Sequence, residues 1–97
     1  MNFLDYFKRG RMQKYNGQHT RYDTILYQGA EQKCTIKWTY HYSSNTFDIT
    51  FIGLTNSNID IWDQLSESQR YNANSGCISV IQEWARKEGL SYPYDWH

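Results

Sequence analysis

The clearest pattern along the chain is an alternation of apolar and polar positions between Lys33 and Leu54. In the first half of this stretch the apolar side chains occupy the even positions, namely Cys34, Ile36, Trp38, Tyr40 and Tyr42. After a polar break at residues 43–45 the alternation resumes on odd positions, namely Phe47, Ile49 and Phe51. A period of two is typical of a half-buried strand, and a short polar break between two such runs indicates a hairpin.

The turn of this hairpin determines which side chains meet across the two strands. With the turn centred on Ser44 and Asn45, Trp38 lies opposite Phe51, and all the apolar side chains share one face. A slip of one residue would move one apolar set to the other face. The remaining pairs in this register are Tyr40–Ile49, Tyr42–Phe47, Thr39–Thr50 and His41–Asp48.

A weaker alternation over residues 21–28 predicts a third strand that precedes the hairpin. A three-residue loop over 29–31 would join them and keep one apolar face. The pairs in this register are Leu26–Cys34 and Tyr22–Trp38. The second face of the meander keeps three apolar side chains that a partner or the termini would cover, namely Ile25, Tyr27 and Ile52.

Three helices are expected around the meander. Asn2 can cap a short first helix that directs Phe3, Leu4 and Phe7 to the core. A second helix covers residues 59–71, and a polar break over 71–74 separates it from a third, which runs from Ser75 through Lys87. This last helix has an apolar stripe of Cys77, Ile78, Ile81, Trp84 and Ala85. We therefore predict an α+β fold, in which a three-stranded antiparallel meander packs against a C-terminal helix in the order α-β-β-β-α-α.

The composition narrows the class of protein. Ninety-seven residues fit a single domain, residues 1–97, that can bury a core without disulfides or metals. Aromatic side chains make up 18% of the chain, which excludes a disordered chain. Some of these rings fill the core, and others are candidates for an interface, because Tyr, Trp and Arg dominate binding hot spots.

Cys34 and Cys77 both fall on predicted core faces, so we expect free buried thiols. No apolar run approaches the roughly 20 residues that a bilayer requires. Charged residues also interrupt the first apolar stretch, so no secretion signal is indicated. These features predict a cytoplasmic protein without a membrane segment.

The net charge is zero, yet the charges are unevenly distributed along the chain. Residues 1–40 hold seven basic and three acidic groups, and residues 41–97 hold three basic and seven acidic groups. Cations interleaved with aromatic rings over residues 8–21 suit a phosphate backbone or an acidic protein surface. The aromatic tail, residues 90–97, either docks on another molecule or folds over the second face of the sheet. The predicted partner-binding residues are Arg9, Arg11, Lys14, Tyr15, Arg21, Tyr92, Tyr94 and Trp96.

No catalytic constellation is apparent. The three histidines are scattered, and no His or Cys pair has the spacing of a zinc site. His41 beside Asp48 could orient an imidazole, but no nucleophile is expected nearby. The glycines are isolated, so there is no phosphate-binding loop. We predict that the chain is not an enzyme and that it needs no cofactor and no metal.

A helix followed by a three-stranded meander and a helix resembles the topology of the double-stranded RNA-binding domain. That resemblance implies a lysine-rich start to the last helix, which contacts the RNA backbone. The corresponding stretch here, Asn74–Ile78, holds no cation. Lys33 and Lys37 on the outer strand face, with the basic segment 8–21, could instead hold single-stranded nucleic acid.

In general character, the chain resembles the small accessory proteins of phages and mobile elements, although no motif carries this resemblance. It implies a protein-binding module that inhibits or modulates a host protein or protein complex, such as the RecBCD nuclease or a CRISPR effector. The alternatives are a single-stranded nucleic-acid-binding protein and an immunity protein that neutralises a toxin. We expect a monomer or a homodimer, since an uncovered sheet edge favours dimerisation.

Overall fold

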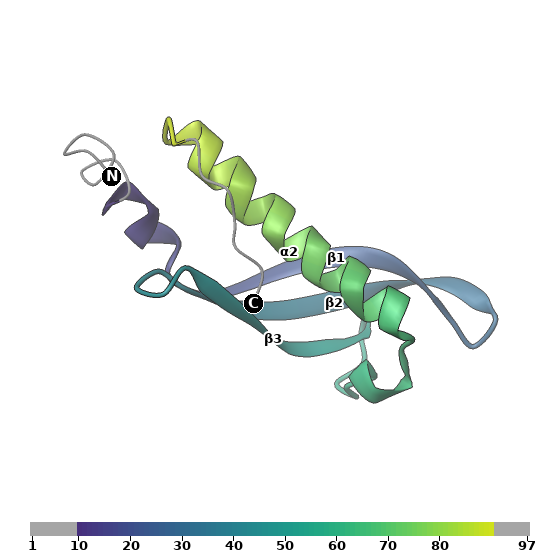
Figure 1. Cartoon of the computed structure of the whole chain (residues 1–97). Coiled ribbons are helices and arrows are strands. Elements are labelled where there is room, and N and C mark those ends of the chain that lie inside the picture. Colours follow the sequence, from purple (N-terminus) through teal and green to yellow (C-terminus); the bar gives the residue numbers. More distant parts are fainter. Residues whose placement is uncertain (1–9, 91–97) are drawn as a thin grey trace.

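The computed structural model describes residues 10–90, with the side chains of residues 12–90. Two 3-10 helices, three strands and one α-helix follow one another along the chain (Figure 1). They are η1 (Gly10–Tyr15), β1 (Gly17–Tyr27), β2 (Ala30–His41), β3 (Thr46–Leu54), η2 (Trp62–Gln64) and α2 (Glu67–Lys87). The expected first helix, with Asn2, Phe3, Leu4 and Phe7, lies outside the described residues.

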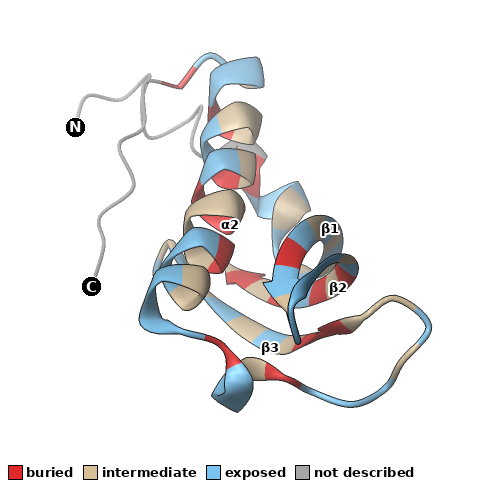
Figure 2. Cartoon of the chain, turned by 90° about the vertical axis from the view of Figure 1, so that its right-hand side faces the viewer, coloured by how far each residue is buried: buried red, intermediate tan, exposed pale blue. Residues whose placement is uncertain are grey.

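The three strands form an antiparallel sheet in the order β1-β2-β3, and α2 lies across one of its faces (Figure 2). The predicted α+β architecture is therefore confirmed. The core between the sheet and α2 contains the inward side chains of β2, which are Cys34, Ile36, Trp38 and Tyr40. From α2 it contains Ala73, Cys77, Ile78, Ile81 and Ala85. In the described part of the chain, no helix is long and apolar enough to cross a membrane.

The hairpin of β2 and β3 has a different register from the predicted one. A four-residue turn, Tyr42–Asn45, joins the strands, and Trp38 lies opposite Ile49. A bulge next to Trp38 then shifts the register by one residue, so that Ile36 lies opposite Ile52. Because the bulge reverses the inward and outward positions, Ile52 is buried in the core and Phe51 lies on the other face. The predicted pair of Trp38 with Phe51 is wrong because the turn is centred one residue earlier than expected, which pairs Trp38 with Ile49, and the bulge then pairs Phe51 with Lys37.

The predicted register of β1 is also wrong. A two-residue turn, Gln28 and Gly29, joins β1 to β2, with φ of 54° and 82°. Two positive φ values define the type I′ turn, which matches the twist of a hairpin. The resulting register pairs Asp23 with Cys34 and directs the odd positions of β1 towards α2. Ile25 is therefore buried, whereas Tyr22 and Leu26 are 59% and 58% exposed.

One continuous helix replaces the two helices that were predicted after the sheet. Residues 59–61 are not helical, and α2 begins after Ser66, which forms a capping box with Gln69. The expected break over residues 71–74 is absent because Ala73 is buried against the sheet and the Asn74 side chain donates to the Arg70 carbonyl at 3.0 Å. Ser75 is an interior residue of α2 and not a cap.

Gly53 on β3 lies where the chain leaves the sheet and passes back over it. The Ile61 N–H donates to the Ile52 carbonyl at 2.8 Å, which ties the following segment to β3. A Cβ at Gly53 would overlap both the Ile59 carbonyl oxygen, at 2.5 Å, and the Phe51 ring, at 2.6 Å. A side chain at this position would therefore separate the segment from the sheet.

We expect Gly53→Ala to lower the free energy of unfolding by about 1–3 kcal/mol, because a backbone carbonyl must move to admit the methyl group. Urea unfolding measures this change. Ser68→Ala, at an exposed position of α2, is the control and should leave stability nearly unchanged. A loss in Ser68→Ala as large as that in Gly53→Ala contradicts this interpretation.

Candidate protein-binding surface

The structure places only three of the predicted partner-binding side chains, those of Lys14, Tyr15 and Arg21. Arg11 belongs to η1, but its side chain lies outside the described part. The other four predicted residues also lie outside the described residues, namely Arg9, Tyr92, Tyr94 and Trp96.

Tyr15 and Lys14 join η1 to the C-terminal end of α2. The Tyr15 ring stacks on Trp84, with ring centroids 4.2 Å apart and an angle of 4° between the ring planes. The Trp84 ring in turn stacks on Trp38, with ring centroids 5.6 Å apart. Lys14 forms an ion pair with Glu88, and the hydrogen bond to this carboxylate raises the pKa of Lys14. Both predicted binding residues are thus engaged within the fold.

Arg21 lies beneath α2 and connects it to β1. Its side chain is only 14% exposed, and Nη2 donates to the Ala73 carbonyl at 2.5 Å. Nε lies 3.5 Å from Cys77 Sγ, and Nη1 lies 3.4 Å from the Asp23 carboxylate. Glycine at position 76 leaves room for the guanidinium group, which a Cβ would overlap. Arg21 therefore has a structural role, since its charged group is not available to a partner.

We expect Arg21→Met to lower the free energy of unfolding by about 1–3 kcal/mol, because the thioether keeps the stem but loses the hydrogen bonds to α2. Chemical denaturation checks this value. Lys37→Met, on the exposed side of β2, is the control and should leave stability nearly unchanged. Equal stability of the two variants contradicts a structural role for Arg21.

Cys34 and Cys77 are both free and buried in the core. Burial raises the pKa of each thiol, and at Cys77 the nearby Arg21 opposes the rise in part. A thiol with a raised pKa is a poor nucleophile at neutral pH. These cysteines are therefore core residues, as their places in the sequence pattern predicted.

A raised pKa in the folded state links stability to pH. At pH values above about 9, the ordinary thiol pKa, the unfolded thiols lose their protons before the folded thiols do. The free energy of unfolding should then fall as pH rises, by at most about 1.4 kcal/mol per pH unit for each thiol. Urea unfolding from pH 7 to 10 measures the slope. The variant Cys34→Ala/Cys77→Ala should have a smaller slope, and an unchanged slope contradicts the prediction.

The face of the sheet opposite α2 presents a different surface, which we call the open sheet face. Within residues 10–90, no helix or further strand covers it along β1 and β2 (Figures 1 and 2). The alternation of each strand directs the even positions of β1 and the odd positions of β2 onto this face. They include Thr20, Tyr22, Thr24, Leu26, Glu31, Lys33, Thr35 and Lys37, with Phe51 from β3.

Apolar and basic groups alternate across the open sheet face. The Lys33 ammonium lies 5.4 Å from the centroid of the Tyr22 ring, and the Lys37 ammonium lies 5.3 Å from that of Phe51. Tyr22 and Leu26 are largely exposed, whereas Phe51 is half-buried. Of the acids of the two neighbouring strands, Glu31 lies beside the β1–β2 turn, and Asp48 binds His41 at 2.8 Å. The centre of this face is therefore basic, with exposed apolar groups at its β1 side.

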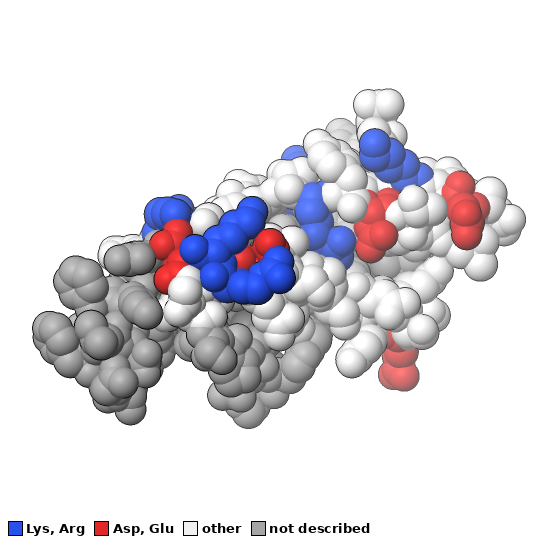
Figure 3. Space-filling view, turned by 90° about the horizontal axis from the view of Figure 1, so that it is seen from above, with Lys and Arg blue, Asp and Glu red and all other residues white. Residues whose placement is uncertain are grey.

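The face that carries α2 has a mixed charge. Basic and acidic side chains lie next to one another in the view from above (Figure 3). On α2, Arg86 forms an ion pair with Glu83. Lys14 and Glu88 come from the basic and acidic halves of the sequence and form an ion pair. The separation of charge along the chain therefore does not give this face a single sign of charge.

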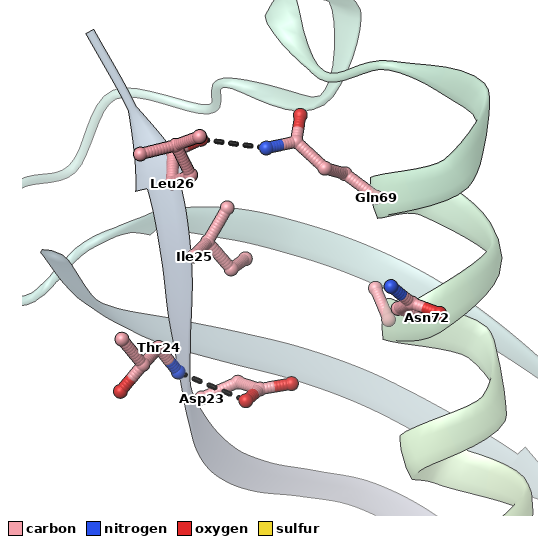
Figure 4. Close-up of a pocket in the computed structure, with 7 residues that line it drawn as sticks. Asp23, Thr24, Ile25, Leu26, Gln69 and Asn72 are labelled. Carbon is pink, nitrogen blue, oxygen red and sulfur yellow. Dashed lines mark hydrogen bonds between the residues drawn. The ribbon is translucent and has the colours of Figure 1, made fainter. Parts of the chain in front are cut away.

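A pocket of about 310 Å³ lies where β1 meets α2. Side chains from the two elements face one another across it (Figure 4). Its lining combines apolar Ile25, Leu26 and Ala73 with polar Asp23, Thr24, Gln69 and Asn72. Across residues 10–90, no group of three His, Cys, Asp or Glu side chains could hold a metal ion.

No family model matches the chain, and neither a curated protein nor a solved structure matches it significantly. The topology that resembles the double-stranded RNA-binding domain gains no support from these comparisons. The last helix begins at Glu67, with an acid in its first turn, so its start differs from the lysine-rich start of that family.

Sequence reasoning missed Tyr22 and Leu26 as candidate binding residues, because it directed both towards the core. The adjacent residues Gln28 and Gly29 were the available signal, since a glycine-containing pair between two alternating runs is typical of a two-residue hairpin turn. With that turn, both side chains fall on the open sheet face.

Proposed function

We propose that the chain is a non-enzymatic protein-binding module that binds its partner through the open sheet face. The observation that carries this proposal is the exposure of Tyr22 and Leu26 on a sheet face that no described element covers. An exposed ring beside an aliphatic side chain gives a large apolar contact, and aromatic anchors contribute most of the binding energy of many interfaces. Lys33 and Lys37 add positive charge that favours an acidic partner surface.

The partner class that we propose is a host protein or protein complex, which the bound module inhibits or modulates. The support for this class is the general character of the chain, which is small and rich in aromatic residues. The proposed contact residues, Tyr22, Leu26 and Lys33, replace the basic segment as the centre of the interface. Tyr15 and Arg21 pack within the fold, and the exposed Lys14 pairs with Glu88, so we place none of the three in the proposed contact.

Single-stranded nucleic acid is the second candidate partner, because rings and cations lie together on the open sheet face. Bases stack on exposed aromatic side chains, and lysines neutralise the phosphates. Here, however, each ring already has a lysine over it, and Phe51 also packs against Gly53. The zero net charge further weakens a general attraction to phosphate. We therefore favour a protein partner.

An affinity pull-down with the tagged chain tests this proposal. Lysate of the source cells is treated with nuclease or left untreated, and the captured proteins are identified by mass spectrometry. We expect one stoichiometric protein that survives nuclease and whose recovery falls at least about tenfold with Tyr22→Ser/Leu26→Ser.

Ile59→Ser is the matched control, because Ile59 is an exposed apolar residue outside the strands. It should retain the partner, and both variants should keep the thermal midpoint of the wild type. Loss of the captured protein after nuclease treatment supports single-stranded nucleic acid as the partner instead. Full recovery with Tyr22→Ser/Leu26→Ser rules out the open sheet face as the interface.

A further inference from the structure

The two edges of the sheet differ in how far the chain itself occupies them. On β3, the backbone N–H of Ile61 donates a hydrogen bond to the carbonyl of Ile52, so part of this edge is already paired. β1 is the other edge, with 11 residues, and its strand partner in the described structure is β2 alone. A long edge strand presents unpaired backbone groups that can pair with another chain.

The β1–β2 turn determines which backbone groups of β1 point away from the sheet. In a two-residue hairpin the residues that flank the turn, here Tyr27 and Ala30, form a hydrogen-bonded pair, and the next pair points outward. Two side-chain contacts agree with this assignment. The Thr24 N–H donates to Asp23 Oδ1 at 2.9 Å, and the Leu26 carbonyl accepts from Gln69 Nε2 at 2.6 Å.

The same alternation directs the N–H and C=O groups of Thr20 and Tyr22 outward, because residues two apart in a strand share one direction. Among the described residues, no side chain forms a hydrogen bond to these four groups. Asp23 and Gln69 thus occupy the edge near the turn, whereas no side chain of the described part of the chain bonds to the edge at Thr20 and Tyr22.

On β1 the pocket between β1 and α2 is lined by residues 23–26, so it begins next to Tyr22 and continues beside the part of the edge that Asp23 and Gln69 occupy (Figure 4). A strand added to β1 would direct alternate side chains towards α2 and towards the open sheet face. A side chain opposite Asp23 would point to the α2 side and enter the pocket at this end, towards Ile25 and Ala73. The partly exposed Asp23 carboxylate in this lining disfavours an acid there, so an aliphatic side chain fits this side.

On the open sheet face, the charge favours an acidic side chain from the added strand. Lys33 leans from β2 over the Tyr22 ring and so brings its ammonium towards the β1 edge. Two acids share this face: Glu31 lies opposite Leu26, near the turn, and Asp48 on β3 binds His41 at 2.8 Å. An acidic side chain opposite Tyr22 would therefore complement Lys33.

We propose that the partner presents an extended segment that adds to the β1 edge as a fourth strand of the sheet. Its backbone pairs with Thr20 and Tyr22, an aliphatic side chain enters the pocket between β1 and α2, and an acidic side chain meets Lys33. Strand addition of this kind takes affinity from backbone hydrogen bonds and specificity from alternate side chains. This inference rests on the proposed protein-binding function and specifies how the partner is held.

Hydrogen exchange followed by NMR tests the proposal with a defined probe, a capped nine-residue peptide in which glutamate alternates with valine. At saturating peptide, exchange of the Thr20 and Tyr22 amides should slow at least about tenfold, because these N–H groups gain partners. The amides of Arg21 and Asp23 already face β2 and should change little. A peptide with lysine in place of glutamate should bind at least about tenfold more weakly.

Thr20→Pro removes one outward N–H, and proline is tolerated at such edge positions. This variant should bind the probe at least about tenfold more weakly, whereas Thr20→Val, which keeps the N–H, should bind like the wild type. Circular dichroism confirms that each variant is folded. The exchange pattern of the wild-type protein provides the test if Thr20→Pro is unfolded.

The outcomes separate this inference from the proposed function. No binding of the probe, or binding that leaves the Thr20 and Tyr22 amides unprotected, overturns strand addition. Protection of these amides without any probe, together with a dimer in sedimentation, shows that a second copy occupies the edge, and this also overturns it. If the pull-down partner depends on Tyr22 and Leu26 but not on the N–H of residue 20, the protein-binding function stands without strand addition.

Discussion

The two-residue turn at Gln28 and Gly29 is the constraint on which most of the structure depends. Both residues have positive φ, and this geometry sets the register of β1 against β2. Because side chains alternate along a strand, the same register decides whether the odd or the even side chains of β1 face α2. It also decides which backbone groups of β1 point out of the sheet, and so connects the core, the open sheet face and the available edge.

The register places charged and polar groups of β1 beneath α2, where partners must compensate for the loss of water. Arg21 meets this requirement through the Ala73 carbonyl, Cys77 and Asp23. The absence of a side chain at Gly76 provides the space for its guanidinium group. At the same end of the sheet as η1, stacked rings of Tyr15, Trp84 and Trp38 form the contact between the helices and the sheet. Two residues of the predicted basic binding segment, Arg21 and Tyr15, thereby hold the two layers together.

Within residues 10–90, the single helix layer leaves the other side of the three-stranded sheet uncovered along β1 and β2, and moderately apolar groups lie there. Tyr22 and Leu26 lie on β1, so they adjoin both the open sheet face and the β1 edge. The pocket beside β1 extends this region towards α2. Side chains and backbone groups that a partner could use are therefore concentrated on one strand.

The sequence by itself determined the elements whose patterns are strict. The alternation of β2 correctly placed Cys34, Ile36, Trp38 and Tyr40 in the core, and the apolar stripe of Cys77, Ile78, Ile81 and Ala85 correctly gave the buried side of the C-terminal helix. Such patterns predict burial because each residue's environment follows from its place in a repeating geometry. The three-stranded meander followed from the same patterns.

Only the tertiary structure decided the registers, the extent of α2 and the location of the candidate surface. The alternation of β1 is ambiguous, since apolar residues occupy both of its sides. The hydrogen bond from Arg21 to α2 favours the register that directs Arg21 towards the helix, which hydropathy alone would reject. The polar stretch at residues 71–74 is helical because Ala73 packs on the sheet. A bulge at β3 exchanged the places of Phe51 and Ile52. The bulge, the continuous α2 and the pairing of Arg21 depend on contacts between residues distant in sequence, which no local pattern contains, whereas the register of β1 also had a local signal in the turn at Gln28 and Gly29.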